Sequence, residues 1–266
     1  MGIFIFLIAA MLVFYGLKTI ELAYVLKHKR PYFVYYPIFL KKLNPKQKAI
    51  LQEQFHFFKK LSPKHQVYFE HRVSVFINSK MFIGRENLVV TDEMKVLIAA
   101  TGVMLTFGFR NYSIGLIERI FIYPDIFYSP QNASYHKGEF NPRLKSLVLS
   151  WKHFIKGFKY HDDNVNLGIH EFAHAIHLNS LKKRDVSATI FSDGFQGLMD
   201  MLTKDETLRK TLIASDYFRA YAYTNPYEFV AVIIETFIET PQDFKLQFPE
   251  IYNRTRQMLN FRFAGY

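Results

Sequence analysis

The sequence contains no cysteine among its 266 residues. Disulfide bonds, thiolate metal sites and iron–sulfur clusters are therefore excluded. Any metal ion must be bound by His, Asp or Glu side chains, and such ligands favour zinc or another borderline cation. The sequence also lacks a G-x-S-x-G nucleophile elbow and a P-loop, which argues against these two classes of enzyme.

Acidic side chains are scarce in the first 50 residues, where Glu21 is the only one. The same stretch carries eight basic side chains: Lys18, Lys27, Lys29, Arg30, Lys41, Lys42, Lys46 and Lys48. Of the formal net charge of +11, +7 therefore lies in this stretch and +4 in the rest of the chain. Basic charge that follows an apolar segment is typical of a contact with a membrane surface. We therefore predict a membrane, and no nucleic acid, as its partner.

Residues 3–17, IFIFLIAAMLVFYGL, form an uninterrupted apolar run. As a helix this run spans about 22 Å, and its continuation to Leu26 spans about 36 Å, enough to cross a hydrocarbon core of about 30 Å. We predict a membrane anchor in residues 1–30 that crosses once through residues 3–26; a buried core helix is the alternative. A cleavable signal peptide fits poorly, because no positive residue precedes the run and no clear cleavage site follows it. The basic cluster after the run places the rest of the chain in the cytoplasm, at the cytoplasmic membrane.

Helical signals dominate the rest of the chain, with a few strands between them. Helices are predicted over residues 45–82, over 91–107 behind the N-cap Thr91, over parts of 178–215 between SDG-type turns, and over 225–241. Strands rich in Ile, Val and Leu are predicted at residues 117–124 and 146–151, with residues 128–142 between them as a loop. This order predicts an α+β fold, mostly helical with a small mixed sheet.

The segment GIHEFAHAIH, residues 168–177, contains the pattern His-Glu-x-x-His. On a helix His170 and His174 lie about 40° apart around the axis, so both imidazoles face one point. Glu171 lies at the edge of the same face, where it suits a base that takes the proton of a water held on a metal ion. His177 could compete for the metal, but we expect it behind the ligands, as a hydrogen-bonded neighbour of the site or of the core.

A catalytic zinc ion needs a third protein ligand. The best source is the segment TNPYEFVAVIIETFIETP, residues 224–241, which carries Glu228, Glu235 and Glu239 within about 20° of one line on a helix. The surrounding positions are almost wholly apolar, so these carboxylates need partners. Glu228 could instead complete a capping box behind Asn225, and Glu235 fits equally well as the ligand. The pattern alone leaves the third ligand as one of these acids.

Five segments occur in an order that resembles a known family of zinc peptidases, the Mlc titration factor A family. The segments are TDEMKVLIAA at 91–100, IFIYP at 120–124, LVLSW at 147–151, HEFAH at 170–174 and NPYEFVAVIIETF at 225–237. The resemblance covers roughly residues 50–260, and the catalytic domain of anthrax lethal factor looks like a more distant relative. It implies a zincin-like metallopeptidase domain, here residues 31–266, with one zinc ion per chain.

The resemblance assigns roles to the residues of the site: His170, His174 and Glu228 as zinc ligands and Glu171 as general base. It also places a tyrosine that stabilises the oxyanion seven residues before the ligand glutamate. That residue is Tyr221, with Tyr223 as a close competitor. Glu235 would then accept a hydrogen bond from a ligand histidine.

By the same resemblance, the strand SLVLSW presents its edge to an extended substrate. The residues of that edge are Leu147, Val148, Leu149 and Ser150. Two features depart from the family pattern. His177 stands where members usually carry Asp, and the apolar N-terminus is not part of the soluble pattern.

These features predict a zinc-dependent peptidase, anchored to the membrane, that hydrolyses a peptide or protein substrate. The alternative is a regulatory zinc-binding protein that sequesters a transcription factor or a membrane partner, as the family name suggests. Glu171 favours the enzyme, because a structural zinc site has no use for it. A closed structural site would also want a fourth ligand, which His177 could supply.

Overall fold

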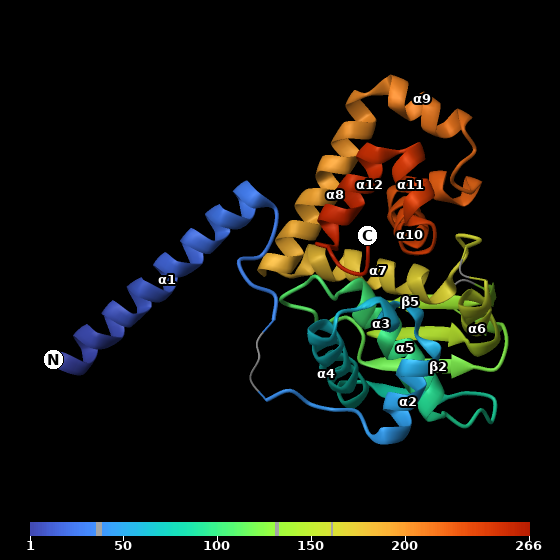
Figure 1. Cartoon of the computed structure of the whole chain (residues 1–266), viewed down its shortest axis with the longest axis horizontal. Helices are drawn as coiled ribbons and strands as arrows, with labels where there is room; N and C mark the ends of the chain where they lie inside the picture. Colours follow the sequence, from blue (N-terminus) through green and yellow to red (C-terminus); the bar gives the residue numbers. More distant parts are fainter. Residues whose placement is uncertain (36–38, 131–132, 161) are drawn as a thin grey trace.

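The computed structural model describes residues 1–35, 39–130, 133–160 and 162–266. Within these ranges the helices are α1 (Gly2–His28), α2 (Pro45–Gln54), α3 (His56–Lys60), α4 (Pro63–Ser79), α5 (Asp92–Leu105), α6 (Trp151–Lys159), α7 (Leu167–Lys182), α8 (Val186–Lys204), α9 (Glu206–Ala214), the 3₁₀-helix η1 (Ala220–Tyr223), α10 (Pro226–Glu239), α11 (Pro241–Gln247) and α12 (Pro249–Met258). The strands are β1 (Met81–Gly84), β2 (Arg119–Tyr123), β3 (Phe127–Ser129), β4 (Ser134–His136), β5 (Gly138–Asn141) and β6 (Ser146–Ser150). The predicted fold, mostly helical with a small mixed sheet, is confirmed (Figure 1).

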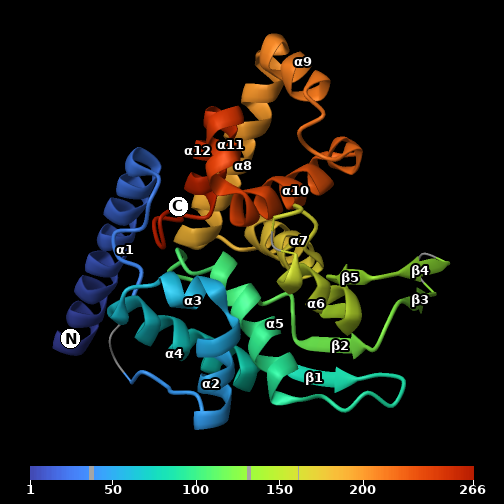
Figure 2. The ribbon, with the colours of Figure 1, turned by 45° about the vertical axis from the view of Figure 1, so that its right-hand side comes forward.

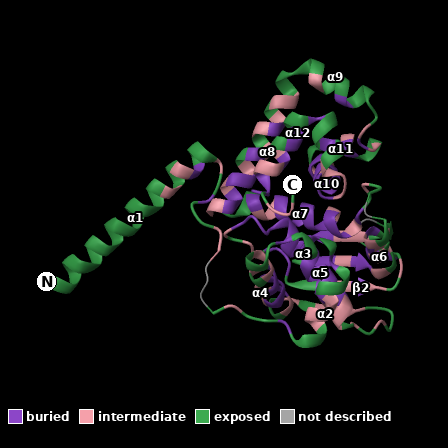
Figure 3. Cartoon of the chain, in the orientation of Figure 1, coloured by how far each residue is buried: buried purple, intermediate pink, exposed green. Residues whose placement is uncertain are grey.

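α1 extends away from the rest of the molecule (Figure 1, Figure 2). Only Val25 is buried along its length, and Figure 3 shows the helix exposed almost from end to end. The predicted apolar N-terminal helix is confirmed, and the alternative of a buried core helix is wrong, since none of its most apolar stretch is buried. Among the described residues, α1 alone is long and apolar enough to cross a membrane.

The C-terminal end of α1 contacts the body of the protein through two ion pairs. Glu21 pairs with Arg110, which lies between α5 and β2. Lys29 Nζ lies 2.7 Å from Asp193 Oδ2 on α8. The end of the apolar helix is therefore fixed to the body, while the remainder of the helix projects from it.

Four strands form a mixed sheet in the order β1-β2-β6-β5. β1, β2 and β6 are parallel, and β5 is antiparallel to β6. β3 and β4 pair separately, as a hairpin that projects beyond the sheet (Figure 2). The predicted strands at residues 117–124 and 146–151 are confirmed. Two other predictions are wrong: residues 128–142 hold β4, β5 and part of β3 instead of a loop, and β1 begins inside the stretch 45–82.

β6 lies inside the sheet, with β2 hydrogen-bonded along one edge and β5 along the other. The prediction that this strand offers a substrate-binding edge is therefore wrong for Leu147, Val148, Leu149 and Ser150. The reason is that β5 covers the edge in question. The free edge on this side of the sheet belongs to β5.

α5, α7 and α10 form the apolar centre of the body (Figure 3). α5 begins at the predicted N-cap, where Thr91 Oγ1 accepts a hydrogen bond from the backbone N of Met94. α7 packs against α5, α10 and β5. This packing brings one face of α7 to the first turn of α10 and to the end of the sheet.

α8 runs without interruption through Ser192, Asp193 and Gly194, where the SDG pattern predicts a turn. That prediction is wrong because the glycine has a packing role. A Cβ at position 194 would lie 2.6 Å from Cγ of Met258, so its absence allows α8 and α12 to approach each other closely.

Candidate metal centre

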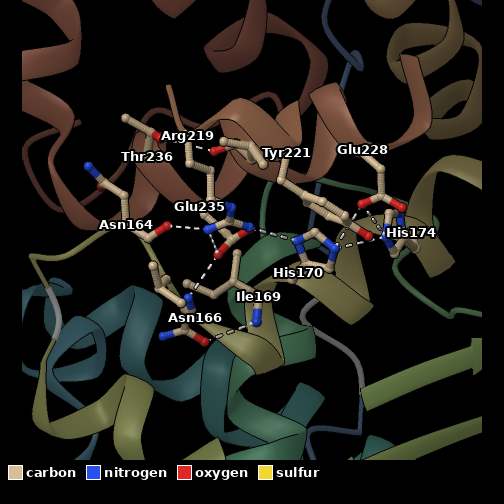
Figure 4. Close-up of polar contacts among 12 residues, drawn as sticks. Asn164, Asn166, Ile169, His170, His174, Arg219, Tyr221, Glu228, Glu235 and Thr236 are labelled. Atoms are coloured by element: carbon tan, nitrogen blue, oxygen red, sulfur yellow. Dashed lines mark hydrogen bonds and ion pairs between the residues drawn. The ribbon is translucent and has the colours of Figure 1, made fainter. Parts of the chain in front are cut away.

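The two histidines of the His-Glu-x-x-His segment lie on α7, and Glu228 lies in the first turn of α10 (Figure 4). His170 Nε2 is 3.0 Å from His174 Nε2 and 3.1 Å from Glu228 Oε2. His174 Nε2 is 3.3 Å from the same oxygen. Among the described residues, these three side chains form the group that could hold a metal ion.

The geometry of the three ligand atoms fits a zinc ion. A tetrahedral ion that binds its ligands at about 2.0–2.1 Å holds them about 3.3 Å apart, close to the three distances observed here. Two imidazoles and one carboxylate are also a ligand set of catalytic zinc, which keeps a fourth position for water or substrate.

Glu228 faces the histidines and does not complete a capping box. Asn225 caps α10, since its Oδ1 accepts hydrogen bonds from the backbone N of Tyr227 at 2.9 Å and of Glu228 at 3.0 Å. Burial alone would raise the pKa of the Glu228 carboxyl, but His170 and His174 outweigh it and hold that pKa well below its usual range. The ionised carboxylate is the form that binds a metal.

His170 contacts Glu235 on its other side, two turns after Glu228 on α10 (Figure 4). His170 Nδ1 lies 2.6 Å from Glu235 Oε1, the contact expected between a ligand histidine and this acid. Burial lowers the pKa of His170, but hydrogen bonds with Glu228 and Glu235 outweigh burial and raise it to about 9. A metal ion that binds Nε2 must therefore displace a proton from this ring.

Arg219, just before η1, completes this network, and no sequence pattern identifies it. Its guanidinium binds both oxygens of Glu235, at 2.6 Å and 3.1 Å, and donates to the backbone O of Asn164 at 2.6 Å. The backbone N of Asn166 donates to Glu235 Oε2 at 2.8 Å. Glu235 is 1% exposed, and both of its oxygens accept hydrogen bonds, as a buried carboxylate requires. Glu239, the last acid on the line, accepts a hydrogen bond from Asn166 Nδ2 at 3.0 Å.

His174 is held by ring stacking. Its imidazole lies on Tyr227 with ring centroids 3.8 Å apart and planes 3° apart. Its Nδ1 is buried and has no hydrogen-bond partner within the described part of the chain. Burial lowers the pKa of His174, which favours the neutral ring that a metal binds.

His177 lies one turn further along α7, in an aromatic cluster. Its ring packs against Phe195 at 4.4 Å between centroids, and against Phe191 and Tyr227. Burial, and next the charge of His174, lowers the pKa of His177 to about 4. Its contact with the ligands is indirect, through the ring of Tyr227, and its buried Nδ1 has no hydrogen-bond partner among the described residues.

Glu171 is buried beside β5. A Cβ on Gly138 would come within 2.7 Å of Glu171 Oε1, so the carboxylate lies directly against the backbone of the edge strand. Burial is the main cause that raises the pKa of Glu171 to about 7; His170 opposes the rise and Glu228 adds to it. A carboxyl group of this kind accepts and releases a proton near neutral pH, as a general base must.

Tyr221 lies on η1 beside His170, with 6.0 Å between ring centroids (Figure 4). Its side chain is 49% exposed and lines the same cleft as His170 and Glu171. Burial, together with Glu228, raises the pKa of Tyr221 to about 12, so the phenol keeps its proton. The competing Tyr223 is used elsewhere, since its hydroxyl donates to the backbone O of Leu212 at 3.1 Å.

Of the three candidate ligands, His170 lines a cleft of about 420 Å³ between α7, β5, α6 and η1. Its lining includes His170, Glu171 and Tyr221 on the side of the candidate ligands, and Gly138 on the edge strand. A peptide that enters this cleft therefore passes a metal site, a buried carboxylate and a phenol.

The chain matches the family model described as glucose-regulated metallo-peptidase M90 over residues 38–260. The matched range begins after α1 and includes α7, η1 and α10. The chain is also similar to a protein of Synechocystis sp. named Uncharacterized protein slr2042. The two are 28% identical over 242 residues, which cover 83% of this chain and 85% of the relative.

Proposed function

The chain belongs to the family of glucose-regulated M90 metallopeptidases, as the five sequence segments indicate, and we propose that it is a zinc-dependent peptidase. His170, His174 and Glu228 would hold one zinc ion per chain. When bound there, the ion supplies a Lewis acid that polarises the scissile carbonyl and activates a water molecule at neutral pH. The observation that supports this proposal best is that the three ligand atoms lie within 4.8 Å of one another, and that one of the ligands, His170, lines a cleft together with Glu171.

Glu171 would act as the general base and then as the general acid. It takes a proton from the attacking water and passes it to the nitrogen of the leaving amine. Tyr221 would donate its hydroxyl hydrogen to the oxygen that becomes negative as the carbonyl is attacked. Glu235, together with Arg219, would keep His170 in the orientation of a ligand, with Nδ1 toward Glu235 and Nε2 toward the metal site.

The substrate backbone would add to β5 as a further strand, the role predicted for β6. Lys137 O accepts a hydrogen bond from Ser150 N at 2.7 Å, so the backbone groups of this residue face β6. Because hydrogen bonding alternates along an antiparallel strand, the N–H and C=O groups of Gly138 and Phe140 face the free edge. Gly138 lies against Glu171, and a peptide on this edge would therefore pass the base.

We further propose that α1 anchors the enzyme in the cytoplasmic membrane, with residues 3–26 crossing it and the catalytic domain, residues 31–266, in the cytoplasm. The apolar side chains of α1 are exposed, and the basic cluster follows them directly. Because Glu21 pairs with Arg110 of the body, the last turns of α1 from Glu21 onward would lie at the membrane surface, and the ion pairs of Glu21 and Lys29 would hold the catalytic domain close to it.

The peptidase is tested by comparing the full-length protein with its Glu171→Gln variant, both purified in detergent and loaded with zinc. Hydrolysis of a mixed set of fluorogenic peptides is expected to fall roughly 100- to 10,000-fold, the contribution of a general base. Zinc content measured by mass spectrometry should stay equal, because Glu171 is not a proposed ligand. Glu250→Gln, an exposed glutamate on α12, is the matched control and should cleave normally.

Chelation and zinc re-addition should abolish and then restore cleavage by the native protein. If both proteins hold zinc and neither cleaves any peptide, the enzyme proposal fails. The regulatory zinc-binding alternative then applies, and the search turns to a partner at the membrane.

A further inference from the structure

The outer side of the active-site cleft is basic. Its lining includes five basic side chains: His136, Lys137, His153, Lys156 and Arg219. Arg219 is neutralised by Glu235, which it binds through both oxygens. Lys137 and Lys156 are exposed, and neither forms an ion pair within the described part of the chain. Two lysines without an ion pair among the described residues therefore line the cleft, and Lys156 Nζ also lies 6.0 Å from the ring centroid of Tyr160.

The two lysines come from segments far apart in the sequence, and both line the cleft. Lys137 directly precedes Gly138, whose backbone lies against the Glu171 carboxylate. Lys156 lies on α6, one turn after His153. Burial, and next the charge of Lys137, lowers the pKa of His153, which lines the same cleft.

Acidic residues of the protein do not cancel these charges. Asp125, near His153, has its own partner, since its Oδ2 lies 2.6 Å from Lys152 Nζ. The acids that line the cleft are Glu171 and Glu235, and Glu235 is bound to Arg219. Glu228 faces His170 and His174, and Glu171 is buried, and among the described residues neither carboxylate forms an ion pair with these lysines. The charge of Lys137 and Lys156 then remains for a ligand.

We propose that the cleft selects peptides that carry a carboxylate close to the scissile bond, and that Lys137 and Lys156 recognise it. This inference rests on the proposed peptidase for the position of the substrate. The carboxylate is either an Asp or Glu side chain or the free C-terminus of the peptide. Both are anions that two ammonium groups at one cleft attract, and an exposed pair of this kind changes an affinity about three- to fivefold.

Peptide binding to the zinc-loaded Glu171→Gln full chain tests the inference without the need for turnover. Three acetylated alanine hexapeptides serve as probes, measured by calorimetry: one with Glu at the third position and an amidated end, its Gln counterpart, and the Gln peptide with a free C-terminus. We expect one or both anionic peptides to bind at least about threefold tighter than the neutral one. The anionic peptide that gains identifies the source of the carboxylate.

The variants locate this preference. In the Lys137→Gln, Lys156→Gln double variant the anionic and neutral peptides should bind equally, and zinc content should be unchanged. Lys159→Gln is the matched control, because this exposed lysine lies one turn further on α6 and does not line the cleft. It should keep the preference. In the parent protein, added salt should weaken the preference, since exposed charges are screened within about 8 Å at physiological ionic strength.

Equal binding of all three peptides, binding of none, or a preference that survives loss of both lysines would overturn the inference. Hydrolysis of the same peptides by the native protein is measured separately. An anion preference without hydrolysis of these peptides or of the mixed fluorogenic set refutes the peptidase and leaves the carboxylate site in place. Hydrolysis without an anion preference supports the peptidase and refutes the carboxylate site.

Discussion

α1 and α10 are both strongly apolar helices, yet they have opposite surroundings. Of the 27 residues of α1 only Val25 is buried, whereas ten of the 14 residues of α10, Phe229–Ile238, are buried in the core. Figure 3 shows the two extremes in one chain. An apolar helix is stable only where it is removed from water. α10 finds that environment inside the protein, and α1 must find it outside.

The positions of the charges follow the same difference. Within residues 3–26 of α1 they are Lys18 and Glu21, near the C-terminal end, where Glu21 reaches Arg110. In α10 the carboxylates of Glu228, Glu235 and Glu239 occupy one line, and each has a partner in the protein. The apolar residues of α10 therefore surround partnered charges. Those of α1 form a surface without charges.

The largest expected effect comes from placing charges in the apolar part of α1. Each Lys near the centre of a membrane helix costs about 2.5–3.5 kcal/mol of insertion free energy. Leu12→Lys combined with Val13→Lys should therefore release most of the protein from the membrane. The fraction that floats with membranes after carbonate extraction measures the effect. Leu12→Ala with Val13→Ala is the control that removes apolar area without adding charge, and it should stay bound.

If the double-lysine variant floats like the native protein, α1 is not the anchor. If the alanine control is also released, the result reflects lost apolar area or a disturbed fold. Circular dichroism and zinc content of the soluble fraction separate these two causes.

The next largest effect is expected when a charge on α10 is removed by substitution. Zinc sites are held with binding free energies on the order of 10 kcal/mol, so the loss of one of three ligands in Glu228→Gln should cost roughly 3–4 kcal/mol, or several hundredfold in affinity. Competition with a chromophoric chelator measures this directly. Retention of native zinc affinity would exclude Glu228 as a ligand and favour another donor.

Local spacing explains what could be predicted from the sequence. The caps Thr91 and Asn225, and the faces on which His170, His174 and Glu228 lie, follow from helix geometry within a few residues. The α7 pair and the α10 acid meet because ten residues of each helix are buried and the two helices pack against each other. The apolar N-terminal helix was predictable from its uninterrupted apolar run.

The wrong or missing predictions all depend on contacts between distant segments. β5 is a strand because it pairs with β6, and its glycine, Gly138, is required by the approach of Glu171. The SDG pattern at Gly194 predicts a turn, but the glycine lies within α8 and allows Met258 of α12 to approach closely. Arg219 lies sixteen residues before Glu235, with η1 between them, so no helical period connects the two. Such contacts are set by tertiary packing, which a single sequence does not display.

The smallest expected effect concerns Glu235, which contacts His170 through Nδ1, the ring nitrogen on the side away from the metal site. Glu235→Gln leaves Arg219 without its carboxylate and replaces one acceptor oxygen by an amide that donates. Supporting residues of this kind typically change metal affinity by about 10–100-fold, so zinc binding should weaken in that range, less than in Glu228→Gln. Glu239→Gln is the matched control one turn further, because its carboxylate contacts Asn166 and not a ligand. Its zinc affinity should equal that of the native protein. If the native protein and Glu235→Gln bind zinc with equal affinity, the buried charge of Glu235 serves folding alone. The two proteins should then differ in the midpoint temperature of thermal unfolding.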